Sequence, residues 1–433
     1  MGIFYFLACF GPLYTNFWNY KTIFDARFGF PNDVLHPVLE VVQLCALATA
    51  VLHIRPVEEM SRPANTPETF LFCLANTLGL LYILFTNCEI RFIWVEGETV
   101  PSRHMAEKDL KHNRFTLCIV LAATLWSGVL YLSNDGTASE MGEVNHGPMI
   151  LMILSWATKP WIMYLFYVVL SPKDFKKYSV PINIEFCIHR YGEWTMLMLG
   201  ESILSLLIVN DVPSSQDYVA KYYTTFYVGV VSVTLLQYLY FKSQPHSADH
   251  HAMRRTRISG FSYGWITQLY SAALIVVGVS YKMILTEYTL EYEQKYGLRI
   301  AESSSSTSDG YRSLATKDDY DQASSYYEQK KLLAKNEARQ GKIAWFFGLS
   351  LGLTFLFLDL MLLAHNGVEG FRTRSRCPTS GNIRLVGFVL VVVSRILITA
   401  FIMTLGFYYS EPNAIAWLGL TSIVLQIIVR VLG

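Results

Sequence analysis

Apolar residues run along this chain in long stretches separated by shorter polar segments. About 20 apolar residues are enough to cross a bilayer as a helix, and windows of this kind occur eleven times. The predicted spans are residues 2–20, 34–54, 69–88, 115–133, 149–171, 191–209, 222–241, 260–285, 343–364, 384–408 and 413–432. Because lipid offers the backbone no hydrogen-bond partners, each span is expected to be helical. The pattern predicts an all-α fold, a polytopic transmembrane helical bundle of about 11 spans.

The linkers between the spans differ in their content of Lys and Arg. The basic linkers are 89–114, 172–190, 242–259 and 365–384. Linkers 134–148 and 409–412 contain neither residue, and 210–221 has only Lys221. Because cytoplasmic loops are enriched in Lys and Arg, this alternation predicts a cytoplasmic C-terminus and an N-terminus on the opposite side. It does not indicate which membrane holds the protein.

Composition supports a lipid environment for the core. Only 16% of the residues are charged and 52% are hydrophobic, whereas a soluble globular chain carries about 25% charged residues. The net charge of +1 gives no general attraction to nucleic acid or to an anionic surface. The seven cysteines form no CxxC pair and are interpreted as small core residues. We expect no cofactor and no structural metal.

The spans fall into two helical regions, residues 1–285 and 343–433, on either side of a polar segment, 286–342. This segment is rich in Ser, Tyr and charge, which predicts a disordered centre and allows a short helix at 325–339. Alternation of the linkers places the segment outside the cytoplasm. Phosphorylation of its Ser and Tyr residues would instead require the cytoplasmic side, and the sequence leaves both sides open.

Two charged residues lie near the middle of consecutive spans. Lys159 is in the fifth span and Glu201 is in the sixth, between Gly200 and Ser202. A charge in hydrocarbon costs roughly 2.5–3.5 kcal/mol on insertion scales. Antiparallel neighbours could bring the two groups to one level, and glycine would let another backbone approach. A structural ion pair and a proton or cation site are both compatible with this pattern.

Ionisable and amide side chains also gather at the predicted cytoplasmic ends of the early spans. They are His189, Arg190 and Glu193 at the start of the sixth span, and Asp25, Arg27, His36, Glu40 and Gln43 near the first cytoplasmic loop. Several of these groups titrate, so the set could form a proton relay or a gate. The alternative is a set of ordinary interfacial charges and helix caps.

Other charged positions suggest structure rather than chemistry. Arg395 in the tenth span and Asp359 in the ninth are within reach of each other, which predicts a structural ion pair. The HSADHH run at 246–251 lacks a ligand scaffold, so no metal is expected there. The sequence contains no HExxH, GxSxG or Walker motif, and we do not expect an enzyme.

Two short segments carry a family resemblance. HRYGE at 189–193, followed by LGESI at 199–203, resembles the signature of the low-temperature-requirement A (LtrA) family of membrane proteins. The block at 18–43 is similar to that family's W…T-x-F-D-x-R-F…D-D…Q block, and LYF at 239–241 matches its W-L-Y-F ending. The resemblance covers most of residues 14–285. It implies a membrane location and a role in cold tolerance, and it supplies no transport substrate.

Three differences from that family affect the interpretation. Members of that family usually open with a helix carrying an E-L-F-F-D-L-V-like motif, and this chain begins after it, which fits either a truncated sequence or a divergent form. Adding that helix would raise the count to twelve spans. The family's Glu-Arg is His189-Arg190 here, and segment 286–342 is unusually long. With the opening helix included, two six-helix repeats in parallel orientation become one possible arrangement.

Two functions are compatible with the sequence. The first is a proton- or ion-coupled transporter or channel, with a site at Glu201, Lys159, Ser202 and Gly200 and with the cytoplasmic groups as its access path. The second is a non-transporting membrane sensor or scaffold for low-temperature or stress adaptation. The partners expected are membrane lipids and protons or small ions; the sequence specifies neither a substrate nor an oligomeric state.

Overall fold

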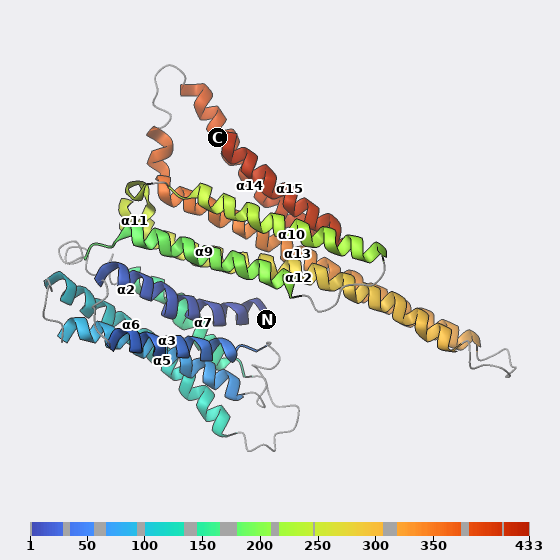
Figure 1. Cartoon of the computed structure of the whole chain (residues 1–433), viewed down its shortest axis with the longest axis horizontal. Coiled ribbons are helices and arrows are strands. Elements are labelled where there is room, and N and C mark those ends of the chain that lie inside the picture. Colours follow the sequence, from blue (N-terminus) through green and yellow to red (C-terminus); the bar gives the residue numbers. More distant parts are fainter. Residues whose placement is uncertain are drawn as a thin grey trace. The chain divides into compact units, whose positions relative to one another are not determined.

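The computed structural model describes residues 2–28, 35–55, 66–92, 100–133, 145–164, 180–208, 216–245, 247–305, 318–373, 381–408 and 411–432. The described chain is helical and contains no strand. It divides into two compact units, Met1–Arg190 and Tyr191–Gly433. Each unit is described by itself below, and Figure 1 gives the element labels.

Unit 1 begins with a continuous helical segment in which a π-helical turn separates two α-helices. This segment consists of α1 (Gly2–Leu13), the π-helical turn η1 (Tyr14–Asn19) and α2 (Tyr20–Phe28). The remaining helices are α3 (Leu35–Leu52), α5 (Thr66–Phe92), α6 (Val100–Leu132), α7 (Gly147–Tyr164) and the first turns of α9 (Ile184–Leu207). Because π-helical turns are uncommon and often occur at functional sites, η1 is a candidate location for such a site.

Unit 2 contains the rest of α9 and the C-terminal helices. These are α10 (Gln216–Ser243), η4 (Ala248–His250), α11 (Ala252–Arg255), α12 (Arg257–Ser305), α13 (Asp318–Thr373), α14 (Gly381–Tyr408) and α15 (Pro412–Leu432). Helix α13 packs against both α12 and α14, and α15 packs against α10 and α14.

The predicted spans coincide with helices. Within the described residues, seven helices are long and apolar enough to cross a membrane. They include Leu35–Leu52, Pro67–Phe92, Ser102–Leu132, Val219–Ser243, Ile258–Tyr288, Arg339–Asn366 and Asn413–Val431. The other predicted spans fall on the α1–η1–α2 segment and on α7, α9 and α14. The chain is therefore a multi-pass helical membrane protein.

The described parts of the polar segment 286–342 are helical. Helix α12 continues to Ser305 and α13 begins at Asp318, so both flanks of the segment are helical, and residues 306–317 lie outside the described residues. Figure 1 shows α12 and α13 side by side, extending past the other helices of unit 2. At the base of this pair Arg339 donates a 2.8 Å hydrogen bond to the buried Glu287. The expected disordered centre includes residues 306–317 and stays a prediction there, while the short helix allowed at 325–339 lies within α13. Glu, Lys, Gln, Ala and Leu sustain a helix that tertiary packing has started.

Polar side chains line the contact between α5 and α6. Thr77 and Thr124 share a 2.8 Å hydrogen bond between their hydroxyl groups, and both are buried. Thr and Ser side chains also return hydrogen bonds to carbonyls one turn earlier, as Ser127 does to Ala123. Since apolar contacts gain little when helices associate in lipid, such small polar residues contribute to helix pairing.

A close contact fixes α1 against α7. A Cβ atom added at Gly11 would lie 2.5 Å from Cδ2 of Trp156, so only glycine fits beneath that ring. Trp156 precedes the charged Lys159 by one turn. Gly11 thereby sets the distance between α1 and α7.

We expect Gly11→Ala to lower the unfolding free energy by about 1–3 kcal/mol, because overpacking outweighs alanine's better helix propensity. Gly200→Ala is the matched control, since a Cβ there meets no atom within 4 Å. The measurement is thermal unfolding of both purified variants in one detergent. Equal or higher stability of Gly11→Ala would contradict this close packing.

Candidate functional site

A buried lysine lies at the centre of unit 1. Lys159 on α7 is 5% exposed, and its Nζ donates a 3.3 Å hydrogen bond to Oδ1 of Asn16. The same nitrogen lies 5.7 Å from the centre of the Tyr20 ring, a distance suited to a cation–π contact. Asn16 belongs to η1, so the π-helical turn supplies the lysine's hydrogen-bond acceptor.

The carboxylate that acts on this lysine comes from α6. Asp109 is buried, and its charge interacts with that of Lys159. Its Oδ2 also accepts a 3.4 Å hydrogen bond from Nη1 of Arg27 on α2. Asp109 therefore lies between two cations, each of which lowers the cost of keeping it charged in a low-dielectric site.

One turn further along α6 lies a buried histidine, His112. His112 is 3% exposed, both of its ring nitrogens are buried, and neither has a hydrogen-bond partner among the described residues. The charge of Lys159 also acts on this ring. Nearly all buried polar atoms have hydrogen-bond partners. A ring with two buried nitrogens that lack such partners is therefore a position where a bound polar ligand would be stabilised.

The end of unit 1 that the distribution of Lys and Arg predicts to be cytoplasmic carries a second set of charges. Lys21 contacts two carboxylates, Asp25 at 3.2 Å and Glu40 at 2.6 Å. Nearby, Nε2 of His36 lies 3.1 Å from Oε2 of Glu89. Asp25 lies beyond the first predicted span and is the more buried of the two carboxylates. This burial raises the pKa of Asp25 to about 6, although the charge of Lys21 opposes the shift.

The residues predicted to form a gate have separate partners. Arg27 pairs with Asp109, while Gln43 donates a 3.3 Å hydrogen bond to the carbonyl of Phe17. Arg190 exerts its charge on Asp25, and His189 is exposed on α9. These residues belong to unit 1, whereas Glu193 belongs to unit 2. In unit 1 Asp25 is thus linked to Lys21, Glu40 and Arg190, whereas Arg27 and Gln43 contact other elements, and the relay or gate stays a prediction.

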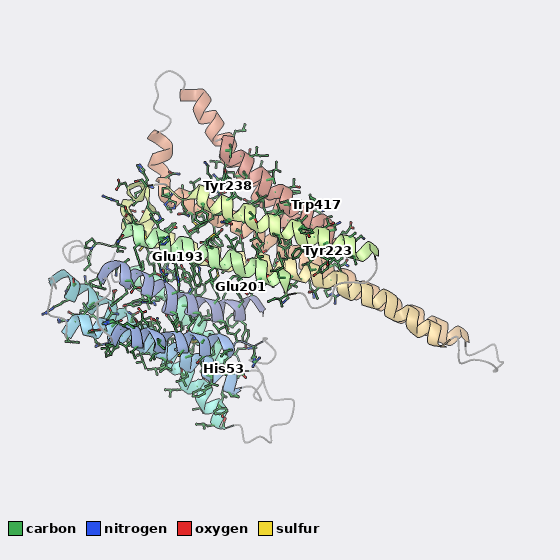
Figure 2. All side chains as sticks on the ribbon, in the orientation of Figure 1. His53, Glu193, Glu201, Tyr223, Tyr238 and Trp417 are labelled. Carbon is green, nitrogen blue, oxygen red and sulfur yellow. The ribbon has the colours of Figure 1, made fainter. Side chains whose placement is uncertain are left out.

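The predicted site around Glu201 has a different environment. Glu201 and Glu193 are both exposed on α9, and Figure 2 labels them. Ser202 faces inward instead, where its hydroxyl donates to the carbonyls of Met198 at 3.0 Å and Leu274 at 3.3 Å. Among the described residues no atom lies within 4 Å of a Cβ added at Gly200, so a close backbone approach at that residue stays a prediction. Within unit 2 a close approach occurs at Gly278, whose added Cβ would lie 2.7 Å from Cα of Ser202.

Lys159 and Glu201 belong to different units, so their pairing stays a prediction. In unit 2 the structure does place Arg395 against Asp359. The run at 246–251 includes His251, which is buried and accepts a hydrogen bond from the backbone of Met253 at the start of α11. Within the described residues no cluster of three or more His, Cys, Asp or Glu side chains could hold a metal ion.

Sequence reasoning missed Asn16, Asp109 and His112. The stretch before residue 115 was treated as a basic linker, but α6 already starts at Val100. The missing signal was periodicity: polar residues recur on one buried face of α6. They are Asp109, His112, Asn113 and Thr116. This i, i+3, i+4, i+7 spacing is that of a helix face turned inward.

We expect Asp25 to take up a proton in the physiological range. Between pH 7 and pH 5 purified wild type should bind about 0.8 of a proton more than Asp25→Asn, since a group with a pKa of about 6 is mostly charged at the first pH and mostly neutral at the second. Lys21→Met should move this uptake to higher pH, because it removes the cation that favours the carboxylate. Potentiometric titration of the detergent-solubilised proteins measures both, and identical curves for wild type and Asp25→Asn would contradict the expectation.

Comparison with known proteins identifies the family of this chain but no substrate. The model of the family described as bacterial low temperature requirement A protein (LtrA) matches residues 1–310. No curated protein and no solved structure matches the chain. The matched residues include all of unit 1, with Lys159, Asp109 and His112, and extend through α9, α10 and α12. The chain belongs to the LtrA family of membrane proteins.

Proposed function

We propose that this protein is a proton- or ion-coupled membrane transporter or channel whose buried polar site is formed by Lys159, Asp109, His112 and Asn16. The observation that carries the proposal is the His112 ring, buried beside a lysine with both nitrogens lacking hydrogen-bond partners among the described residues. Ionisable residues inside membrane helices most often mark ion or proton pathways.

The charge arrangement supports a site that changes its protonation. Asp109 lies between Lys159 and Arg27, so the cluster carries two cations and one carboxylate. A proton on His112 would add a third positive charge beside Lys159, and it would be unfavourable unless an anion entered or Lys159 lost its own proton. Proton movement and ligand entry would therefore be coupled at this place.

The cytoplasmic charges supply an entrance for protons. Burial raises the pKa of Asp25 to about 6. Asp25 and Glu40 both contact Lys21, and the charge of Arg190 also acts on Asp25. Two carboxylates on one lysine favour a state in which one of them holds a proton. A group of this kind near the cytoplasmic surface can pass protons to a deeper site.

One observation favours the alternative, a non-transporting sensor or scaffold. Lys159 already has an acceptor in Asn16 and a counter-charge in Asp109, which is what a purely structural cluster requires. In that case the cluster would exist to hold α1, α6 and α7 together. The two functions therefore predict opposite consequences of removing the lysine charge.

Flux through liposomes tests transport directly. We expect wild-type protein to conduct protons into vesicles that contain a pH-sensitive dye under an imposed potential, and His112→Phe or Lys159→Met to reduce the rate to that of empty vesicles. Lys111→Met is the matched control, because this lysine lies on α6 one residue before His112 yet is 63% exposed. Glu201→Gln should keep its flux if the site lies within unit 1. Wild-type flux equal to that of empty vesicles would favour the scaffold function.

Stability separates the two functions independently. We expect the unfolding free energy of Lys159→Met to lie within about 1 kcal/mol of the wild-type value or to exceed it. Asp109 would still pair with Arg27 in this variant, and an apolar side chain would replace a desolvated charge. Arg27→Met should cost roughly 3–5 kcal/mol, since it breaks the closer buried ion pair. Guanidinium unfolding of the three proteins in one detergent gives the comparison. A large loss in Lys159→Met would show that the lysine serves structure.

A further inference from the structure

Unit 2 holds a second buried charged cluster, formed by its last three helices. Asp359 on α13 accepts hydrogen bonds at a single oxygen, Oδ1, from Nη2 of Arg395 on α14 and from Nη2 of Arg430 on α15. The Arg430 bond is 3.0 Å long, and Nη1 of the same residue donates to the carbonyl of Leu239 at 3.1 Å. The two guanidinium groups lie close enough for their charges to repel.

The charges in this cluster do not balance. Two arginines share one carboxylate, and no other ion pair to either arginine is formed within the described residues. Both side chains are buried, with 9% of Arg395 and 6% of Arg430 exposed. Because a guanidinium group keeps its proton, the surplus positive charge persists in a low-dielectric setting, where it is costly.

Hydrogen-bond donors are in surplus as well. Nε of Arg395, Nε of Arg430 and the hydroxyl of Tyr270 are buried and have no acceptor in the described part of the chain. Tyr270 on α12 is fully buried and interacts with the charge of Arg430, so its hydroxyl belongs to the same cluster. Three unused donors beside an uncompensated positive charge are complementary to an anion with several acceptor oxygens.

We propose that Arg395, Arg430 and Tyr270 form a binding site for the phosphate group of a monoanionic ester. Guanidinium groups bind phosphate oxygens through paired donors, and a tetrahedral oxyanion can accept from donors on several helices. Asp359 holds both arginines when the anion is absent and competes with it. The carboxylate side is the open one, since 24% of the Asp359 side chain is exposed.

The location favours a lipid headgroup as one source of this phosphate. Arg430 lies in the last turn of α15, at the end that the distribution of Lys and Arg predicts to be cytoplasmic. Basic sites between membrane helices on that side bind anionic headgroups. A free phosphate ester from the cytoplasm offers the same chemistry. Asp359, Arg395 and Arg430 lie outside residues 1–310, so the family match does not include them.

Thermal unfolding in detergent with added ligand tests the site. The probes are phosphatidylglycerol, a monoanionic phosphodiester, phosphatidylcholine, its zwitterionic counterpart, and inorganic phosphate. We expect phosphatidylglycerol to raise the melting temperature saturably and phosphatidylcholine to leave it unchanged. Stabilisation by inorganic phosphate as well would indicate a site open to free anions, and its absence would identify the lipid headgroup as the source.

Variants assign the effect to these residues. Arg430→Gln should weaken phosphatidylglycerol binding about tenfold, and Arg430→Lys, which keeps the charge but loses Nε, should weaken it less. Asp359→Asn should bind more tightly, because the competing carboxylate is gone. Arg255→Gln is the control, since it removes an exposed cation from the same unit. Equal responses to the two lipids, wild-type affinity in Arg430→Gln, or no gain in Asp359→Asn would each overturn the proposal.

Discussion

The structure depends on one constraint: a charged side chain within membrane helices needs a partner from another helix. In unit 1 the ammonium of Lys159 on α7 reaches Asn16 in η1 and the charge of Asp109 on α6, which ties three elements together. In unit 2 a single carboxylate, Asp359, joins α13 to α14 and α15. Apolar packing supports both units, yet these partners determine which helices meet at a given depth.

Much of the fold could be predicted because hydropathy reports directly on lipid contact. Every predicted span falls on a helix, although α12 and α13 are far longer than their apolar parts. Composition could not reveal this extension. Segment 286–342 is polar enough to look unstructured, but its flanks continue helices that are already nucleated, and adding residues to an existing helix costs much less than starting one. The Arg339–Glu287 ion pair is one contact between α13 and α12.

The candidate site could be predicted only in part. Lys159 was identified because a charge in mid-span is conspicuous in an apolar sequence. Asp109 and His112 were missed because their neighbours Lys108 and Lys111 made the stretch look like a cytoplasmic linker. The contact partners of the buried charged residues were harder to predict. The sequence gives the depth of a residue along a span, but it does not give the rotation of the helix about its own axis. Glu201 and Ser202 are adjacent, and yet one is exposed and the other is buried against α12.

The two clusters differ in the chemistry open to them. Lysine, histidine and aspartate can gain or lose protons within a few pH units once burial and neighbouring charges act on them, so unit 1 is suited to coupling with protons. Guanidinium groups stay charged under the same conditions, so the Arg395–Arg430 cluster cannot serve as a proton relay and is suited to holding an anion. Proton coupling and anion recognition would then reside in separate units. The family match includes all of unit 1 but stops before α13, so the proposed proton-coupled site lies in the LtrA-like part, whereas both arginines of the proposed anion site lie on helices beyond the match.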